Sequence, residues 1–199
     1  MIIDAVVLAG GRGSRLGGVS KAGLLYDGTS LLERTIAAVG DARHVVVVGD
    51  TPQVAGVPVV RESPAFAGPA AGIAAGLELL GELDVIASDF TVVVACDMPR
   101  VALALPPLLD AVAGDGVVAL GQNGRAQQLV GVYSTALLRR AAAAHREAGD
   151  LENLSVRALL ATLHPLEIAV PAGSTDDVDT WDDAARLGVA DSPPHARAS

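Results

Sequence analysis

A glycine-rich segment near the N-terminus carries the clearest chemical signal in the chain. Residues 8–21 read Leu-Ala-Gly-Gly-Arg-Gly-Ser-Arg-Leu-Gly-Gly-Val-Ser-Lys, with five glycines, three cationic side chains and no acid. They follow an apolar run, residues 2–7, that predicts a first strand. A loop of this composition at a strand end can present backbone N–H groups and fixed positive charges to a polyphosphate. We therefore expect a nucleotide-binding loop here, the alternative being a flexible turn with ordinary surface cations.

Two well-known phosphate loops do not fit this segment. A P-loop has its lysine directly after the last glycine and a Ser or Thr after the lysine. Here two residues separate Gly18 from Lys21, and neither Ser nor Thr follows. A dinucleotide-binding fingerprint that begins at Gly11 needs a small residue at position 16, where Leu16 stands. A dehydrogenase is therefore disfavoured.

A second signal is an acid at the end of an apolar run. Asp97 comes shortly after residues 90–95, which predict a buried strand, and Pro99 then ends the ladder. Because ligands bind at the carboxyl ends of parallel strands, we expect Asp97 to face the same edge as the glycine-rich loop. A carboxylate together with substrate phosphates is a usual ligand set for Mg²⁺. The alternative is a turn-forming Asp before a proline.

The segment 62–72 lies between these two signals and is the third candidate. Gly68 and Pro69 begin a helix that we expect over residues 70–80, and a helix N-terminus favours anions. Glu62 offers a carboxylate that can accept hydrogen bonds from N–H and O–H groups of a ligand. The alternatives are an ordinary helix start and a solvated loop acid.

Together these segments resemble the nucleotidyltransferase signature LxGGxxxRxGxxK, and within that superfamily the chain is most similar to the molybdenum cofactor guanylyltransferases. The resemblance covers nearly the full length. Gly10 stands where related molybdopterin cytidylyltransferases typically carry Ala, which favours guanine. The family usually has Asp at two positions where this chain has Ser20 and Glu62.

The resemblance implies transfer of GMP from GTP to molybdopterin that carries molybdenum, with Mg²⁺ as cofactor. It assigns catalysis to Arg15, Lys21 and Asp97, and metal binding to Asp97 and Asp179, with Asp177 as the weaker alternative ligand. The nucleotide-binding residues it implies are Leu8, Ala9, Gly10, Gly11, Lys21, Glu62, Gly68 and Asp97. We expect no general base, because a phosphate monoester is already an anionic nucleophile.

Other functions remain open at this point. One is a molybdopterin cytidylyltransferase or a sugar-phosphate nucleotidyltransferase of the same fold. Another is a non-catalytic nucleotide-binding regulator, which the departures at Ser20 and Glu62 do not exclude.

The order of strands and helices predicts an α/β fold with three layers around a mostly parallel central sheet. The resemblance makes it Rossmann-like in its nucleotide-binding half, as in nucleotide-diphospho-sugar transferases. Capping boxes at Ser30 with Glu33 and at Thr180 with Asp183 predict two helix starts. We expect further strands at 44–49, 57–60, 90–95, 117–120 and 127–133, and further helices at 70–80, 106–112 and 136–148.

Composition limits the class of protein. The 199 residues fit one nucleotidyltransferase domain over residues 1–190, with a flexible tail at 191–199. The net charge of −9 disfavours nucleic acid as a partner. No apolar run approaches bilayer length and no basic region precedes the first strand, so we expect a cytoplasmic enzyme without a membrane partner. Cys96, the only cysteine, excludes an intrachain disulfide. We expect a monomer or weak homo-oligomer, with transient contacts to proteins of the molybdenum cofactor pathway.

Overall fold

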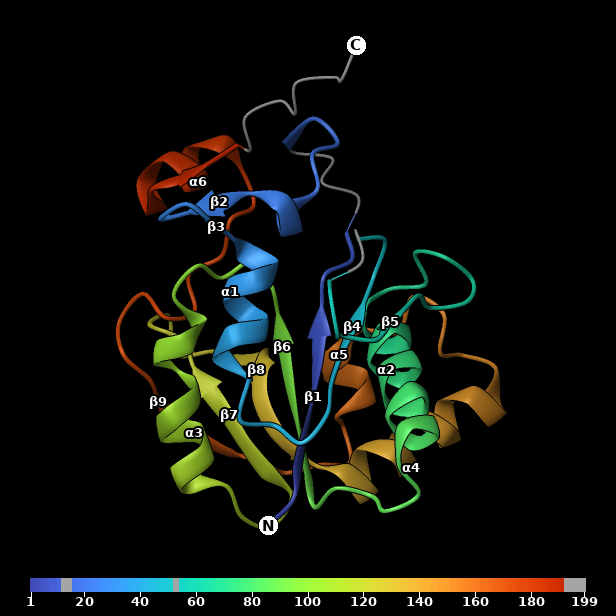
Figure 1. Ribbon diagram of the computed structural model, residues 1–199. Coiled ribbons are helices and arrows are strands. Elements are labelled where there is room, and N and C mark those ends of the chain that lie inside the picture. The colour runs from blue at the N-terminus through green and yellow to red at the C-terminus, as the bar shows by residue number, and fades with distance from the viewer. Residues whose placement is uncertain (12–15, 52–53, 192–199) are drawn as a thin grey trace.

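A seven-stranded sheet forms the centre of the computed structural model, which describes residues 1–11, 16–51 and 54–191 (Figure 1). Its strand order is β5-β4-β1-β6-β8-β7-β9. The strands are β1 (Ile3–Leu8), β4 (Val45–Val48), β5 (Val59–Val60), β6 (Phe90–Ala95), β7 (Gly116–Leu120), β8 (Ala126–Ser134) and β9 (Leu166–Ala169). In this sheet β8 runs antiparallel to both neighbours, and the other pairings are parallel. The predicted mostly parallel sheet is confirmed.

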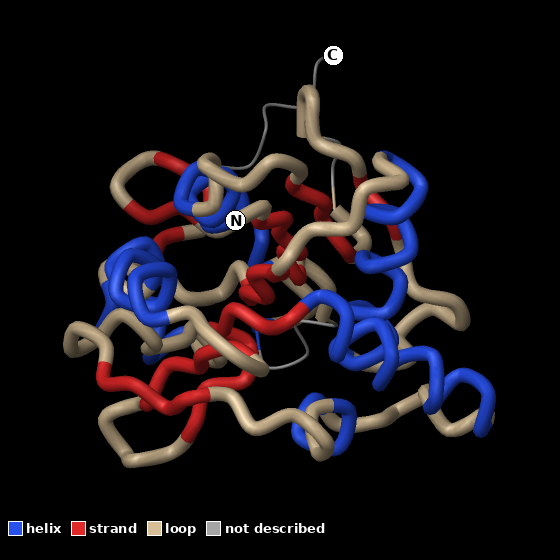
Figure 2. Tube along the Cα trace, turned by 90° about the horizontal axis from the view of Figure 1, so that it is seen from below, coloured by secondary structure: helices blue, strands red, loops and turns tan. Residues whose placement is uncertain are grey.

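Helices cover both faces of the sheet and make the three predicted layers (Figures 1 and 2). On one face lie α1 (Leu31–Ala38) and α3 (Leu105–Ala111), whose leucines pack against alternate residues of β1, β6 and β7. On the other lie α2 (Pro69–Leu83), α4 (Thr135–Ala148) and α5 (Val156–Leu159). Helix α2 comes close to β1 because Gly76 has no side chain. A Cβ there would lie 2.7 Å from a methyl carbon of Val6.

Apolar runs rich in valine explain why β1, β4 and β6 lie inside the sheet, each with a neighbouring strand on both sides. The middle residues of these strands are buried, which suits β-branched side chains on a sheet covered on both faces. The chain is only 3% aromatic, so Val, Leu, Ile and Ala fill both core clusters almost alone.

A small lobe stands at the carboxyl ends of the central strands (Figure 1). It contains a second sheet of order β10-β2-β3, formed by β2 (Leu25–Tyr26), β3 (Thr29–Ser30) and β10 (Val189–Ala190), together with α6 (Trp181–Leu187). A short 3-10 helix, Lys21–Gly23, precedes β2, and another, Val101–Leu103, follows β6. The lobe has its own apolar core of Leu16, Leu24, Leu31, Val178, Ala184, Leu187 and Val189. The lobe therefore joins residues near both ends of the chain.

The local predictions agree with these elements to within a few residues. Ser30 and Thr180 each accept a hydrogen bond from the third helical residue and form the predicted capping boxes. Strand β9 and the small sheet were not predicted. The predicted tail lies, from residue 192 onward, outside the described residues. No helix in the described part of the chain is long and apolar enough to cross a bilayer.

Candidate active site

Strands β1 and β6 stay paired up to their carboxyl ends, where the glycine-rich loop follows β1 and the turn at Asp97 follows β6. The Cys96 N–H donates to the Leu8 carbonyl at 3.0 Å, so Asp97 begins its turn directly beside the start of the glycine-rich loop. The loop ends at Lys21, the first residue of the short 3-10 helix at Lys21–Gly23. Two segments far apart in sequence thus reach one edge of the sheet, as predicted.

The segment before α6 brings two more acids to this edge. The Val178 N–H donates to the Asp97 carbonyl at 3.0 Å and fastens the segment to the end of β6. The Val178 side chain is fully buried in the lobe core, whereas Asp177 and Asp179 flank it and face Asp97. One carboxylate oxygen from each of the three aspartates lies within 4.8 Å of the others. Thr180 then caps α6, so the helix start fixes where this acidic segment ends.

Lys21 bonds both Asp97, at the end of β6, and Asp179, in the segment before α6. Its Nζ donates to Asp97 Oδ2 at 3.0 Å and to Asp179 Oδ1 at 2.5 Å. Burial acts to lower the pKa of Lys21, but the two carboxylates outweigh it and the net pKa is raised. Partial burial and the charges of Asp97 and Asp179 raise the pKa of Asp177. One ammonium against three carboxylates leaves an excess of negative charge in this cluster.

The identity of residue 21 is informative because the chain otherwise uses arginine. Lys21 is the only lysine, and the other 13 of the 14 basic residues are arginines. An ammonium is a compact point charge on a flexible stem, whereas a guanidinium is planar and prefers paired, fork-like contacts. A compact charge can sit between two carboxylates that come from different directions.

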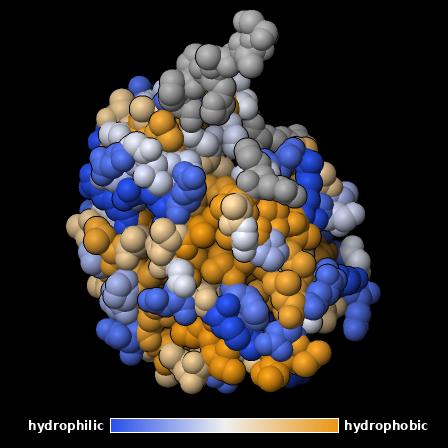
Figure 3. Space-filling model, in the orientation of Figure 1, coloured by the Kyte–Doolittle hydropathy of each residue, from blue (hydrophilic) through white to orange (hydrophobic). Residues whose placement is uncertain are grey.

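A cavity of about 420 Å³ opens beside this cluster. Its lining contains Leu8, Ala9, Gly10, Gly11, Lys21, Val48, Glu62, Phe66, Gly68, Pro69, Gly72, Ala95, Cys96, Asp97 and Leu129. All eight residues predicted to bind nucleotide are among them, so the structure brings them together, while their roles remain predictions. Arg15 lies outside the described residues. In the view of Figure 3 apolar residues gather at the centre of the face, below the lobe.

Close backbone contact shapes the start of the cavity. Gly49, with φ of +144°, lies directly after β4, and a Cβ there would be 2.5 Å from the Gly10 nitrogen. Any side chain at Gly49 would push the glycine-rich loop away from the sheet. Gly68, with φ of +96°, turns the chain into α2 so that the N-terminus of that helix adjoins the cavity.

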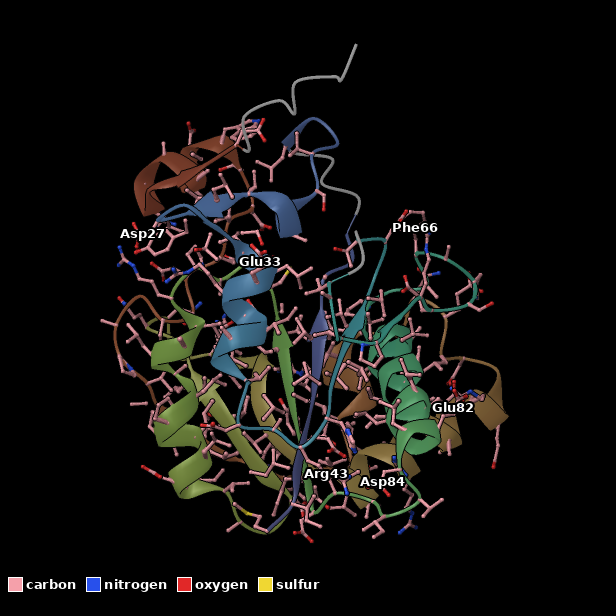
Figure 4. All side chains as sticks on the ribbon, in the orientation of Figure 1. Asp27, Glu33, Arg43, Phe66, Glu82 and Asp84 are labelled. Atoms are coloured by element: carbon pink, nitrogen blue, oxygen red, sulfur yellow. The ribbon has the colours of Figure 1, made fainter. Side chains whose placement is uncertain are left out.

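Glu62 partly organises its own loop, between β5 and α2. Its Oε1 accepts from the Phe66 N–H at 2.9 Å. Phe66, which is labelled in Figure 4, adopts the uncommon φ of +66°. The Arg61 guanidinium carbon lies 4.8 Å from the centre of the Phe66 ring. Sequence reasoning did not single out Phe66, because nothing local in the sequence marks this turn.

Cys96 lies in the wall of the cavity without the character of a nucleophile. It is 4% exposed, and burial together with the Asp97 charge raises its pKa to about 12. A thiol that stays protonated at neutral pH is a poor nucleophile. Cys96 is therefore a core residue in the wall of the cavity.

Comparison with known proteins gives a consistent picture. The family model for the MobA-like NTP transferase domain matches residues 5–166. A molybdenum cofactor guanylyltransferase from Shewanella baltica is 31% identical over 156 residues, which cover 74% of this chain and 76% of the relative. Two other molybdenum cofactor guanylyltransferases, one of them named as probable, are matched over only 47% and 66% of their own length.

Two solved structures show the same fold. Molybdopterin-guanine dinucleotide biosynthesis protein A from Archaeoglobus fulgidus superimposes with a TM-score of 0.67 at 19% identity, covering 92% of this chain and 96% of its own. A manganese complex of a Mycobacterium tuberculosis protein gives 0.62 at 22% identity, covering 94% and 98%. At these identities the likeness concerns the fold alone.

Proposed function

The chain belongs to the family of MobA-like NTP transferases, and on that premise we propose that it transfers GMP from GTP to molybdopterin carrying molybdenum, releasing pyrophosphate. One observation carries the proposal: Lys21 and Asp97 line the cavity and meet Asp179 at its edge. The proposal keeps the expectations of a single domain over residues 1–190, a cytoplasmic location and a monomer or weak homo-oligomer.

The acids fit a magnesium ion. Mg²⁺ prefers hard oxygen ligands at about 2.0–2.1 Å and is usually held by one or two carboxylates plus phosphates. Asp97 and Asp179 would supply the protein ligands, and Asp177 is close enough to serve as a third or to hold a bound water. When bound there, the ion would neutralise part of the negative charge of the triphosphate and of the leaving pyrophosphate.

The rest of the chemistry is alignment and charge. The acceptor phosphate is itself the nucleophile, so the protein must bring two anions together and offset their repulsion. Backbone N–H groups at Gly10 and Gly11 and the ammonium of Lys21 are the groups that we assign to the triphosphate. Arg15, from the segment outside the described residues, is assigned to it as well.

Glu62 provides a physical reason why the site would bind guanine in preference to cytosine. A carboxylate can accept two parallel hydrogen bonds from guanine N1–H and N2–H₂. The corresponding edge of cytosine presents acceptors, O2 and N3, beside a single amino donor. An acceptor facing acceptors is repulsive, and such a mismatch gives strong discrimination.

The test is pyrophosphate release with Mg²⁺ and either GTP or CTP, with molybdenum-loaded molybdopterin or a sugar phosphate as the acceptor. We expect release with GTP and molybdopterin together, at least tenfold faster than with CTP, and a smaller preference in Glu62→Gln. Faster release with CTP would identify a cytidylyltransferase, and release only with a sugar phosphate would identify the other enzyme class. Tight GTP binding without turnover of any acceptor would instead support a regulator.

A further inference from the structure

We propose that Lys21 takes the place of the divalent cation in the nucleotide-free protein, and that the cation enters only together with a triphosphate. When the ion binds the acids, the triphosphate becomes the new anionic partner of Lys21. The identity of that triphosphate rests on the proposed function, whereas the exclusion of the metal by the lysine does not.

A cation on the carboxylate oxygens that bond Lys21 would lie close to the Lys21 ammonium. The Lys21 Nζ lies 3.0 Å from Asp97 Oδ2 and 2.5 Å from Asp179 Oδ1. Since magnesium binds oxygen at about 2.1 Å, an ion on that Asp179 oxygen would lie at most about 4.6 Å from Nζ. A divalent ion and an ammonium at that separation repel strongly.

Because the site is partly buried, we expect the metal ion and the triphosphate to bind together. The Lys21 and Asp97 side chains are only 22% and 24% exposed, so separating them without substitutes would leave poorly hydrated charges unpaired. A metal ion alone would neutralise the acids but leave the Lys21 ammonium without an anionic partner. A metal ion and a triphosphate together satisfy both, because Lys21 lines the same cavity as Gly10 and Gly11, where we place the phosphates.

The residue type suits this exchange. A lysine ammonium has a flexible four-carbon stem and can move between anionic partners while its backbone stays in place. The single lysine of an arginine-rich chain stands at this position. Its uniqueness also makes it directly observable, since no other side-chain ammonium is present.

The first test measures Mn²⁺ binding to the nucleotide-free protein by electron paramagnetic resonance of the free ion. We expect Lys21→Met to bind Mn²⁺ at least tenfold more tightly than the wild type, because it removes the resident charge and keeps most of the length of the side chain. Lys21→Arg, which retains the charge, should bind as weakly as the wild type.

Arg34→Met is the matched control. Arg34 is also a partly buried cation, but it bonds the Pro99 carbonyl and lies over the Tyr26 ring rather than among the acids. Its loss should leave Mn²⁺ affinity within about twofold of the wild type. Equal affinity of Lys21→Met and wild type would overturn the proposal, as would an equal rise in Arg34→Met.

The second test needs no variant and so does not depend on whether one folds. Protein made with ¹⁵N-labelled lysine has a single side-chain ammonium signal. We expect no change in that signal with millimolar Mg²⁺ alone and a clear shift with Mg²⁺ plus inorganic tripolyphosphate. A shift with Mg²⁺ alone, or none with both, would overturn the proposal. Tripolyphosphate carries no base, so these results are independent of the GTP assay, whose failure would count against the proposed function alone.

Discussion

Asp177→Asn should stabilise the folded protein while the neighbouring change Asp176→Asn should not. Asp177 lies in a cluster of three carboxylates within 4.8 Å of one another, with a single ammonium among them. Its carboxylate therefore meets more repulsion than attraction in the free protein. Asp176, by contrast, accepts from the Arg186 guanidinium at 3.3 Å, a favourable contact.

The size of the effect follows from the geometry. Two unit charges 4.8 Å apart repel by about 0.9 kcal/mol in water and about 3.5 kcal/mol at an effective dielectric constant of 20. Asp177 is exposed enough for solvent to screen its charge, so a value near the lower one applies, and attraction to Lys21 cancels part of the two repulsions. We expect a gain of about 0.5–1 kcal/mol, which raises Tm by about 1–4 °C in a chain of this length.

The assay is thermal unfolding at neutral pH and low salt, without metal or nucleotide. The gain should shrink in 1 M NaCl, because salt screens exposed charges. The pKa of Asp177 is raised in the folded state, so its charge costs stability as pH rises through that pKa, and the gain should vanish below about pH 4. A Tm of Asp177→Asn at or below that of the wild type would refute the reasoning, as would an equal rise in Asp176→Asn.

Three further predictions address other parts of the structure. Lys21→Ala and Asp97→Ala should each lower GMP transfer by about 10²-fold or more with an unchanged circular dichroism spectrum; near-native transfer by either would contradict their assigned roles. Cys96, with its pKa raised to about 12, should resist thiol reagents at pH 8 until denaturant is added, and rapid labelling of folded protein would contradict its burial. Gly76→Ala should cost about 1–3 kcal/mol in chemical denaturation, because its Cβ would press on Val6, and an unchanged midpoint would show that the helix can move aside.

Local rules were enough to predict most of the helices and strands from the sequence. The capping box formed by Ser30 and Glu33 is a pattern of only four residues that predicts where a helix begins, and the structure has a helix at that position. The run before Asp97 predicts a buried strand because its valines suit a sheet covered on both faces. The shared sheet edge then follows from the parallel order of β1 and β6.

Long-range pairing of very short strands could not be predicted. Leu25–Tyr26 pairs with Val189–Ala190 across most of the chain, and two residues carry too little pattern to identify either strand. Strand β9 has exposed residues at three of its four positions, so its sequence lacks the alternation of a half-buried strand. The lobe also brings both Asp177 and Asp179 to Asp97, so before the structure only the family resemblance ranked Asp177 below Asp179.

The most direct measurement is a crystal structure with a non-hydrolysable GTP analogue and Mg²⁺. We predict a triphosphate along Gly10 and Gly11, an ion on Asp97 and Asp179, and the Lys21 Nζ moved from the carboxylates onto a phosphate. A nucleotide bound away from this edge, or Lys21 still paired with both acids while the triphosphate is in place, would contradict the account.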